Sequence, residues 1–276
     1  MTPIDPIRHP LLHCAAQGAA WAGQDQFPGS VGADVFEAWL QFIACKGELG
    51  RFHHRLQTST KEQRDETFAE IGCAYFLEKK LGLPIIGWEP PGVAGKKGEF
   101  LVALPDGRRM FVEVKSPGWE AEITRTEPAT VAAARLSQPK YPGVEAFFYS
   151  AEPPIVTAVK KAYGKFPDTT PTLLLIFDDE RVPLTEMCLD DLLGTFYEKH
   201  IPGTKDPSNP TKEKEDGCFF DSRFEQLGAV GVLNYGYAGH PGDLRFALFR
   251  NPHALTAVAV PRDAFAAITI YDGLPG

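Results

Sequence analysis

Two short segments typical of β-strands flank a tight turn near the middle of the chain, and they constrain the fold more than any other feature. The segments are residues 98–104 and 108–115, and the turn between them is Pro105-Asp106-Gly107. This pattern predicts a β-hairpin. Side chains alternate across a strand, so the charges of each strand gather on one side: Glu99 in the first, Glu113 and Lys115 in the second.

The length of the loop decides whether these charges meet. Residues opposite each other in a hairpin project to the same face of the sheet. A three-residue loop brings Glu99 opposite Glu113. A two-residue loop puts Glu99 opposite Val114, which separates the two carboxylates onto opposite faces. The two-residue loop would place Pro105 in the ladder, where it cannot donate a hydrogen bond, so we expect the three-residue loop.

Two facing carboxylates beside a lysine are costly without a further counter-ion. Like charges a few ångströms apart raise the pKa of one group unless a cation sits between them. Carboxylate oxygens are ligands that suit Mg²⁺ or Mn²⁺. The hairpin therefore predicts a site for a divalent cation.

Glu99, the apolar strand after it and the triplet Glu113-Val114-Lys115 resemble the acidic residue and the (D/E)xK element of the PD-(D/E)xK, or restriction-endonuclease-like, nuclease superfamily. The superfamily usually has Asp where this chain has Glu99. The resemblance implies that Glu99, Glu113 and the Val114 carbonyl hold Mg²⁺ or Mn²⁺. It implies that Lys115 orients or deprotonates a metal-activated water, in an endonuclease that hydrolyses phosphodiester bonds of DNA.

A long helix is predicted before the hairpin, over residues 60–81. A capping box at Ser59 or Thr60 begins it, and Gly82 with Pro84 ends it. Apolar residues surround this helix nearly completely, which predicts that it is largely buried. Glu70 lies on one of the apolar sides and therefore needs a partner or a metal.

The sequence leaves the role of Glu70 open. In the nuclease superfamily a Glu on the helix before the core strands often joins the metal site, and Glu70 sits where this resemblance would put it. Alternatively, Glu70 lies at the helix rim or forms half of a structural ion pair. If Glu70 joins the metal site, the metal-free protein carries three clustered carboxylates, with Glu99 and Glu113, offset only by Lys115.

The other elements complete an α/β fold. Residues 84–88 predict a first strand, residues 153–166 a helix, and the apolar run 172–177 a strand buried on both faces. From 60 to 180 the order is αβββαβ, which resembles the restriction-endonuclease-like core with its mixed sheet. Beyond it we expect a helix over 186–199 and three β-type runs that either extend the sheet or form a β subdomain: 227–237, 244–250 and 266–271.

These elements divide the chain into three parts. Residues 1–57 form an N-terminal helical extension, residues 58–200 the nuclease-like core, and residues 218–276 a C-terminal β-rich extension packed on the core. The helical extension is indicated by apolar residues at helical spacing: Val35, Phe36, Trp39, Leu40 and Ile43.

Several polar residues are candidates for contact with nucleic acid. Lys96 and Lys97 lie in the loop that enters the hairpin beside Glu99. Lys160 and Lys161 share one flank of the predicted helix 153–166 with Lys165. Gln138 follows a helical stretch around 129–136, as a Gln does in some superfamily members. A solvated surface explains the lysines at least as well, and it explains the basic segment 51–55 better than phosphate binding does.

Composition bounds the class of protein. The chain has 28 basic and 36 acidic residues, a net charge of −8, which argues against coating nucleic acid by bulk attraction. Five scattered cysteines without metal-ligand spacing predict reduced thiols. The sequence shows no signal peptide and no apolar run of about 20 residues, so we expect a cytoplasmic protein without a membrane span.

Three interpretations follow. The leading one is a Mg²⁺-dependent DNA endonuclease, acting alone, as a homodimer or with a partner subunit. The alternative is a catalytically degenerate nuclease-fold module that binds nucleic acid or a partner protein; Glu99 in place of Asp and the negative net charge favour it. In the third, Glu113 and Lys115 form an ordinary ion pair on a strand of an unrelated α/β protein.

Overall fold

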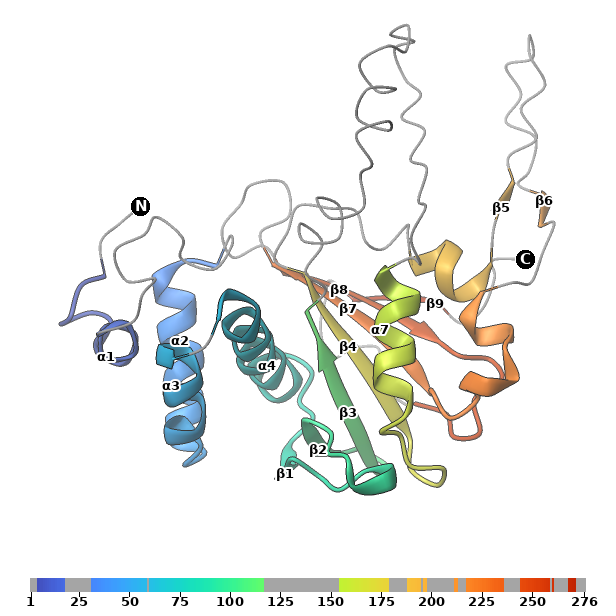
Figure 1. The fold of residues 1–276 in the computed structure, drawn as a ribbon, viewed down its shortest axis with the longest axis horizontal. Coiled ribbons are helices and arrows are strands. Elements are labelled where there is room, and N and C mark those ends of the chain that lie inside the picture. The colour runs from blue at the N-terminus through green and yellow to red at the C-terminus, as the bar shows by residue number, and fades with distance from the viewer. Residues whose placement is uncertain are drawn as a thin grey trace, which may run out of the picture.

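The structure is a computed structural model that describes residues 4–17, 31–58, 60–116, 154–178, 188–194, 196–197, 211–212, 217–235, 244–258, 260 and 268–271. Within these residues, helices and one large sheet form a mixed α/β fold (Figure 1). The helical stretch predicted around 129–136 lies outside the described residues.

Seven strands form one mixed sheet in the order β1-β2-β3-β4-β7-β8-β9. β2 is antiparallel to both of its neighbours, β1 and β3, whereas β4 is parallel to both β3 and β7. β8 is antiparallel to β7 and parallel to β9. The mixed α/β class predicted from the sequence is thereby confirmed. The strands of this sheet are β1 (Ile85–Trp88), β2 (Phe100–Ala103), β3 (Arg109–Lys115), β4 (Thr172–Asp178), β7 (Ala229–Tyr235), β8 (Leu244–Arg250) and β9 (Ile268–Tyr271).

The β2–β3 hairpin has the three-residue loop that the sequence favours. The Leu104 N–H donates to the Arg108 carbonyl at 2.8 Å, so these two residues flank the loop. Gly107 within it has φ of 83°, a conformation that glycine adopts without strain. The ladder keeps this register from the pair Ala103–Arg109 to the pair Phe100–Val112, where it ends. Glu99 directly precedes this last pair and Glu113 directly follows it, and the Glu99 N–H donates to the Val112 carbonyl at 3.0 Å.

Helices cover the two faces of the sheet near β3 and β4. They are α4 (Lys61–Lys79) and α7 (Pro154–Tyr163), and α7 makes the crossover between the parallel strands β3 and β4. Alternate residues of β3 enter different cores: Met110 and Val112 pack in the core that contains α4, and Phe111 in the core that contains α7. The two helices therefore lie on opposite faces of the sheet.

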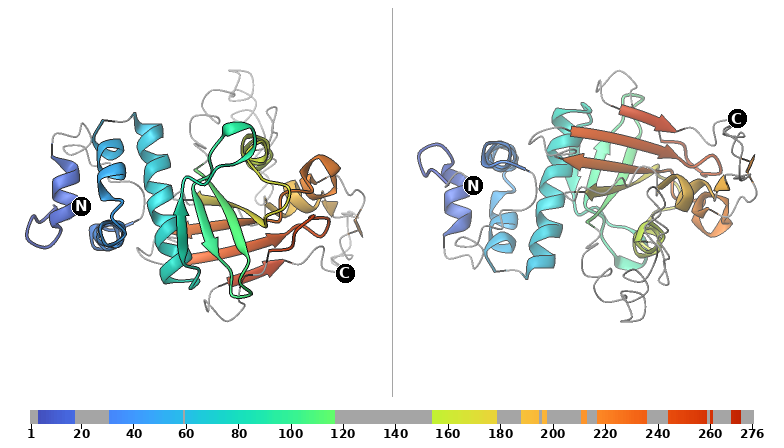
Figure 2. Two further views of the ribbon diagram at one scale, coloured as in Figure 1. Left: turned by 90° about the horizontal axis from the view of Figure 1, so that it is seen from below. Right: turned by 90° about the horizontal axis from the view of Figure 1, so that it is seen from above.

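α4 begins at the predicted capping box, in which Thr60 and Gln63 bond each other's backbone N–H groups. It lies between the sheet and the N-terminal helices, as Figure 2 shows. Trp39 of α2 reaches past α4 and contacts the ring of Phe177 on β4. Packing on both sides explains why α4 is apolar nearly all round. The N-terminal helices are α1 (Pro10–Ala16), α2 (Ala33–Cys45) and α3 (Leu49–Thr58).

The C-terminal strands extend the same sheet instead of forming a separate one. β7 pairs with β4 in parallel, and β8 and β9 follow outward. All seven residues of β7 are buried, because strands lie on both of its sides and apolar side chains cover both of its faces.

The prediction of a helix over residues 186–199 is wrong for the second half of that range. The helical turn η2 (Leu189–Leu193) is followed by Gly194 with φ of 113°, and a short strand, β5 (Phe196–Tyr197), begins two residues later. A left-handed glycine ends the helix there. β5 pairs with β6 (Thr211–Lys212), and short turns of 3₁₀-helix lie at η1 (Val93–Gly95), η3 (Cys218–Phe220) and η4 (Ser222–Phe224).

None of the helices in the described part of the chain is both long enough and apolar enough to cross a membrane.

Gly72 lies where α4 touches its neighbours most closely. A Cβ there would be 2.8 Å from the Trp39 ring and 2.9 Å from the Phe177 ring. We expect Gly72→Ala to lower the free energy of unfolding by about 1–3 kcal/mol through overpacking, although the same change inside a helix usually stabilises by about 0.5–1 kcal/mol. Urea unfolding measures the difference. The control is Gly50→Ala in α3, where no atom lies within 4 Å of the added group; equal destabilisation by both changes would contradict this packing.

Candidate active site

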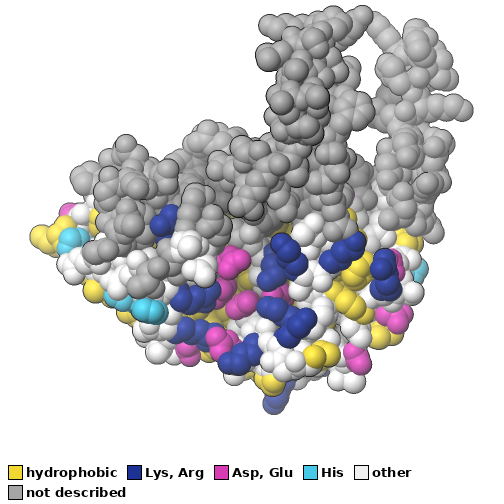
Figure 3. Space-filling view, in the orientation of Figure 1, with side chains coloured by type: hydrophobic (Ala, Val, Ile, Leu, Met, Phe, Trp, Pro, Cys, Tyr) yellow, Lys and Arg dark blue, Asp and Glu magenta, His cyan; other side chains and the backbone are white. Residues whose placement is uncertain are grey.

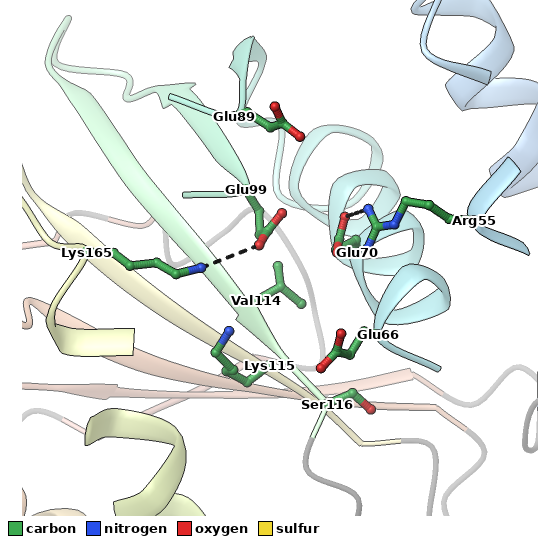
Figure 4. Close-up of a pocket in the computed structure, with 9 residues that line it drawn as sticks. All are labelled: Arg55, Glu66, Glu70, Glu89, Glu99, Val114, Lys115, Ser116 and Lys165. Carbon is green, nitrogen blue, oxygen red and sulfur yellow. Dashed lines mark hydrogen bonds and ion pairs between the residues drawn. The ribbon is translucent and has the colours of Figure 1, made fainter. Parts of the chain in front are cut away.

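A pocket of about 370 Å³ lies at the carboxyl end of β3, between the sheet and the helices α3 and α4. Glu99 enters it from the start of β2, and Lys165 from the chain just after α7. Helix α3 contributes an arginine, and α4 contributes two glutamates one turn apart (Figure 4). The lining residues are Arg55, Glu66, Glu70, Glu89, Glu99, Val114, Lys115, Ser116 and Lys165.

Glu113 lies beneath this pocket and is fully buried. Its Oε1 atom accepts from the Lys115 Nζ at 2.6 Å and from the Lys165 Nζ at 2.5 Å. Its Oε2 atom is also buried and has no hydrogen-bond partner among the described residues. The carboxylate is therefore held by two ammonium groups on one oxygen and left bare on the other.

Glu99 directly precedes β2 and is largely buried as well, with 18% of its side chain exposed. Burial raises its pKa to about 8, and the nearby carboxylates of Glu70 and Glu113 contribute to the same rise. The positive charge of Lys165, whose Nζ is 3.9 Å from Glu99 Oε1, lowers the pKa of Glu99 and so opposes this rise. Three carboxylates thus act on one another at the pocket.

Glu70 combines two of the roles that the sequence left open. Its two carboxylate oxygens accept from the guanidinium of Arg55 at 2.5 and 2.7 Å, a two-pronged ion pair between α4 and α3. This hydrogen bonding to Glu70 raises the pKa of Arg55. Glu70 also lines the pocket and acts on Glu99 through its charge. It is therefore half of an ion pair that forms part of the pocket wall.

Arg55 and Lys165 correct the charge balance predicted for this cluster. The three carboxylates were expected to be offset only by Lys115, but Arg55 holds Glu70 and Lys165 holds Glu113. Each carboxylate has a cation of its own or shares one. Three cations thus face three carboxylates. The expectation of Lys115 alone was wrong because Arg55 and Lys165 come from elements distant in sequence.

The rim of the pocket carries further charge pairs. Glu89, just after β1, pairs with the Arg51 guanidinium at 2.6 Å and with the Lys97 Nζ at 2.8 Å. Lys and Arg side chains flank the acidic cluster on both sides in the space-filling view (Figure 3). The rim is therefore locally richer in cations than the net charge of the chain indicates.

The candidates for nucleic-acid contact fall in different places. Lys97 is tied to Glu89, and Lys96 is exposed, with its Nζ beside Gly164. Lys160 and Lys161 are exposed on α7, away from the lining of the pocket. Gln138 lies outside the described residues.

Sequence reasoning missed five of the residues that line the pocket: Arg55, Glu66, Glu89, Ser116 and Lys165. Lys165 was grouped with the exposed lysines because the predicted helix continued to residue 166. α7 ends at Tyr163, so the chain turns and carries Lys165 toward Glu113. Glu66 had a usable signal, since it lies four residues before Glu70 on the same helix.

The site offers oxygen donors without a ready-made metal cluster. Among the described residues, no three His, Cys, Asp or Glu side chains are placed to hold a metal ion. The bare Oε2 of Glu113 and the raised pKa of Glu99 are nevertheless both features that a cation would relieve. Carboxylate and carbonyl oxygens are the donors that Mg²⁺ and Mn²⁺ prefer, so the donor set fits these ions.

The chain matches no protein family model, no curated protein and no solved structure.

Glu99 makes the stability of the metal-free protein depend on pH. Its pKa is about 8 in the folded protein against an ordinary value of 4.5, so between these values the folded state binds a proton that the unfolded state has lost. The contribution of Glu99 to the free energy of unfolding therefore falls as the pH rises from about 4.5 to about 8. Urea unfolding across this range, with EDTA present, measures the slope.

Two variants isolate this effect. Glu99→Gln removes the fall with pH. Glu89→Gln serves as a contrast. Hydrogen bonding to Lys97 lowers the pKa of Glu89, so the contribution of Glu89 to the free energy of unfolding is lost as the pH falls. Identical slopes in the wild type and Glu99→Gln would contradict the burial of Glu99 beside two carboxylates.

The substitution Glu70→Gln tests the pair with Arg55. Glu70 is buried but Arg55 is partly exposed and can be rehydrated, so we expect a loss of about 1–3 kcal/mol, less than for a pair buried on both sides. The pKa of Glu99 should also fall, because one carboxylate that raises it is gone. Urea unfolding and NMR titration measure the two effects. Glu66 lies one turn earlier on α4 and is exposed, so Glu66→Gln is the control and should leave the free energy of unfolding nearly unchanged.

Proposed function

We propose that this protein is a Mg²⁺- or Mn²⁺-dependent endonuclease that hydrolyses phosphodiester bonds of DNA. The observation that carries the proposal is the closeness of Glu99 and Glu113 at the end of the β2–β3 hairpin: one ammonium group, that of Lys165, lies 3.9 Å from Glu99 and 2.5 Å from Glu113. Lys115, two residues after Glu113, contacts the same carboxylate at 2.6 Å. This constellation resembles the catalytic residues of PD-(D/E)xK nucleases.

The order of the elements supports a restriction-endonuclease-like core. α4, β1, β2, β3, α7 and β4 follow one another, with α4 and α7 on opposite faces and β4 parallel to β3. In this proposal residues 58–200 hold the core, residues 1–57 are a helical extension, and residues 218–276 a β-rich extension.

In the proposed mechanism, Glu99, Glu113 and the Val114 carbonyl would hold the cation. Bound there, Mg²⁺ or Mn²⁺ would supply a water of lowered pKa and would neutralise charge on the scissile phosphate. Lys115 lines the pocket with its ammonium group and would orient the attacking water and stabilise the charge that develops on the phosphate. Glu70 holds the Arg55 guanidinium at the pocket wall, where it would be available to a phosphate.

The rim explains how an acidic chain would hold DNA. Arg51, Lys96 and Lys97 lie on or near the rim, so phosphates of a duplex would meet cations there once Arg51 and Lys97 part from Glu89, although the whole chain carries −8. Contacts of this kind position a duplex without reading its sequence.

One observation favours the alternative, a catalytically degenerate module that binds nucleic acid or a partner protein. Lys115 and Lys165 both contact Oε1 of Glu113, so the site is charge-balanced without a divalent cation. A protein of this kind would bind duplex DNA or a partner through the same rim and would not cut.

Cleavage of supercoiled plasmid tests the proposal. We expect nicking with Mg²⁺ or Mn²⁺ and none with EDTA. Lys115→Ala should lower the rate by about 10²-fold or more, the typical cost of losing one group that stabilises charge in the transition state, and should leave the affinity for Mg²⁺ largely intact. Glu113→Ala should lose Mg²⁺ binding in calorimetry as well as cleavage.

The matched control for Lys115→Ala is Lys80→Ala, an exposed lysine at the end of α4, about 15 Å along the helix axis from Glu70. It removes the same charge and should cut at the wild-type rate. Duplex binding without cleavage in either metal would favour the degenerate module. Equal Mg²⁺ affinity in the wild type and Glu113→Ala would remove Glu113 from the metal site.

A further inference from the structure

Lys165 lies where a cation shared by the two facing carboxylates would lie. Its Nζ atom is 2.5 Å from Oε1 of Glu113 and 3.9 Å from Oε1 of Glu99. Its side chain reaches into the pocket from the side opposite Arg55 (Figure 4). One ammonium group thus sits between two carboxylates of the proposed metal site.

Lys165 also separates Glu113 from the pocket. Glu113 is fully buried and does not line the pocket, whereas Lys165 and Lys115 do. Both ammonium groups contact Oε1 of Glu113, and its Oε2 is buried as well. A cation that enters from the pocket therefore meets an ammonium group before it reaches Glu113.

The backbone of Lys165 is fixed, which leaves the side chain as the part that can move. Its N–H donates to the Ala162 carbonyl at 2.9 Å, and its carbonyl accepts from the Val93 N–H at 3.1 Å. Gly92 packs so closely that a Cβ there would overlap the Lys165 carbonyl oxygen. Phe166, the next residue, is fully buried. The lysine side chain itself is partly exposed on a flexible four-carbon stem.

We propose that Lys165 is a tethered counter-ion: it occupies the cation position of the metal-free site, and a divalent cation binds Glu113 only when Lys165 withdraws. The inference rests on the proposed function, since it takes Glu99 and Glu113 as metal ligands. An ammonium group and a divalent cation on the same carboxylate repel each other strongly at contact distance. Lys165 and the metal therefore compete, and Lys165 sets the metal affinity of the site.

Calorimetric titration of Mg²⁺ and of Mn²⁺ tests the competition. Lys165→Met keeps the length of the side chain and removes its charge, so it should bind both ions at least about tenfold more tightly than the wild type. Lys165→Arg keeps the charge and should bind within about threefold of the wild type. Lys80→Met, at the exposed end of α4, loses the same charge elsewhere and should match the wild type.

A second measurement needs no charge-removing variant and stands even if Lys165→Met fails to fold. In the wild type, the side-chain NMR signals of Lys165, identified by their loss in Lys165→Arg, should shift as Mg²⁺ is added. Those of Lys80 should stay in place. Signals of Lys165 that do not move at saturating Mg²⁺ would overturn the inference.

The outcomes separate this inference from the proposed function. If the wild type binds Mg²⁺ and Lys165→Met binds it with equal or lower affinity, the counter-ion role fails and the metal site stands. If neither protein binds Mg²⁺ or Mn²⁺, the metal-dependent function fails and the inference fails with it.

Discussion

A single buried carboxylate, that of Glu113, sets the requirements for the rest of the site. A charge in the middle of a sheet is strongly destabilising unless cations and hydrogen bonds compensate for it. Here the compensation comes from Lys115 on the same strand and from Lys165, which is 52 residues away in sequence. The second partner depends on the crossover through α7 and on the loop at Gly92 and Val93 that anchors its backbone. Lysines from the strand and from the crossover thus meet at one oxygen atom, and the loop fixes the backbone of the second lysine.

The N-terminal helices are part of this arrangement and not an appendage to it. They bury the outer side of α4, which explains its apolar surface, and they supply Arg55 from α3 to Glu70. Without α3, Glu70 would be a buried carboxylate beside Glu99 with no cation of its own among the described residues. A segment predicted as an extension of the core therefore sets the charge balance of the pocket.

The parts that the sequence predicted are those fixed by local rules. The parity of a strand, the inability of Pro105 to donate and a left-handed Gly107 determine the hairpin register, and a capping box with all-round apolar spacing determines α4. Arg55 and Lys165 escaped because their partners lie 15 and 52 residues away and their direction depends on where a helix stops. A run of charged residues on an exposed helix gives the same sequence pattern whether or not one of its side chains turns toward the interior.

Exposure distinguishes the two kinds of charge in the pocket. The side chains of Glu113, Glu70 and Glu99 are 0%, 9% and 18% exposed, whereas those of Lys165, Lys115 and Arg55 are 21%, 26% and 34% exposed. Glu113 and Glu70 sit on a strand and a packed helix, and Glu99 directly precedes a strand. The cations lie on long side chains with water on one side, so they are the groups with more freedom to move. If the proposed function holds, exchange of these cations for a metal ion or a phosphate would therefore begin with movement of the lysines and the arginine.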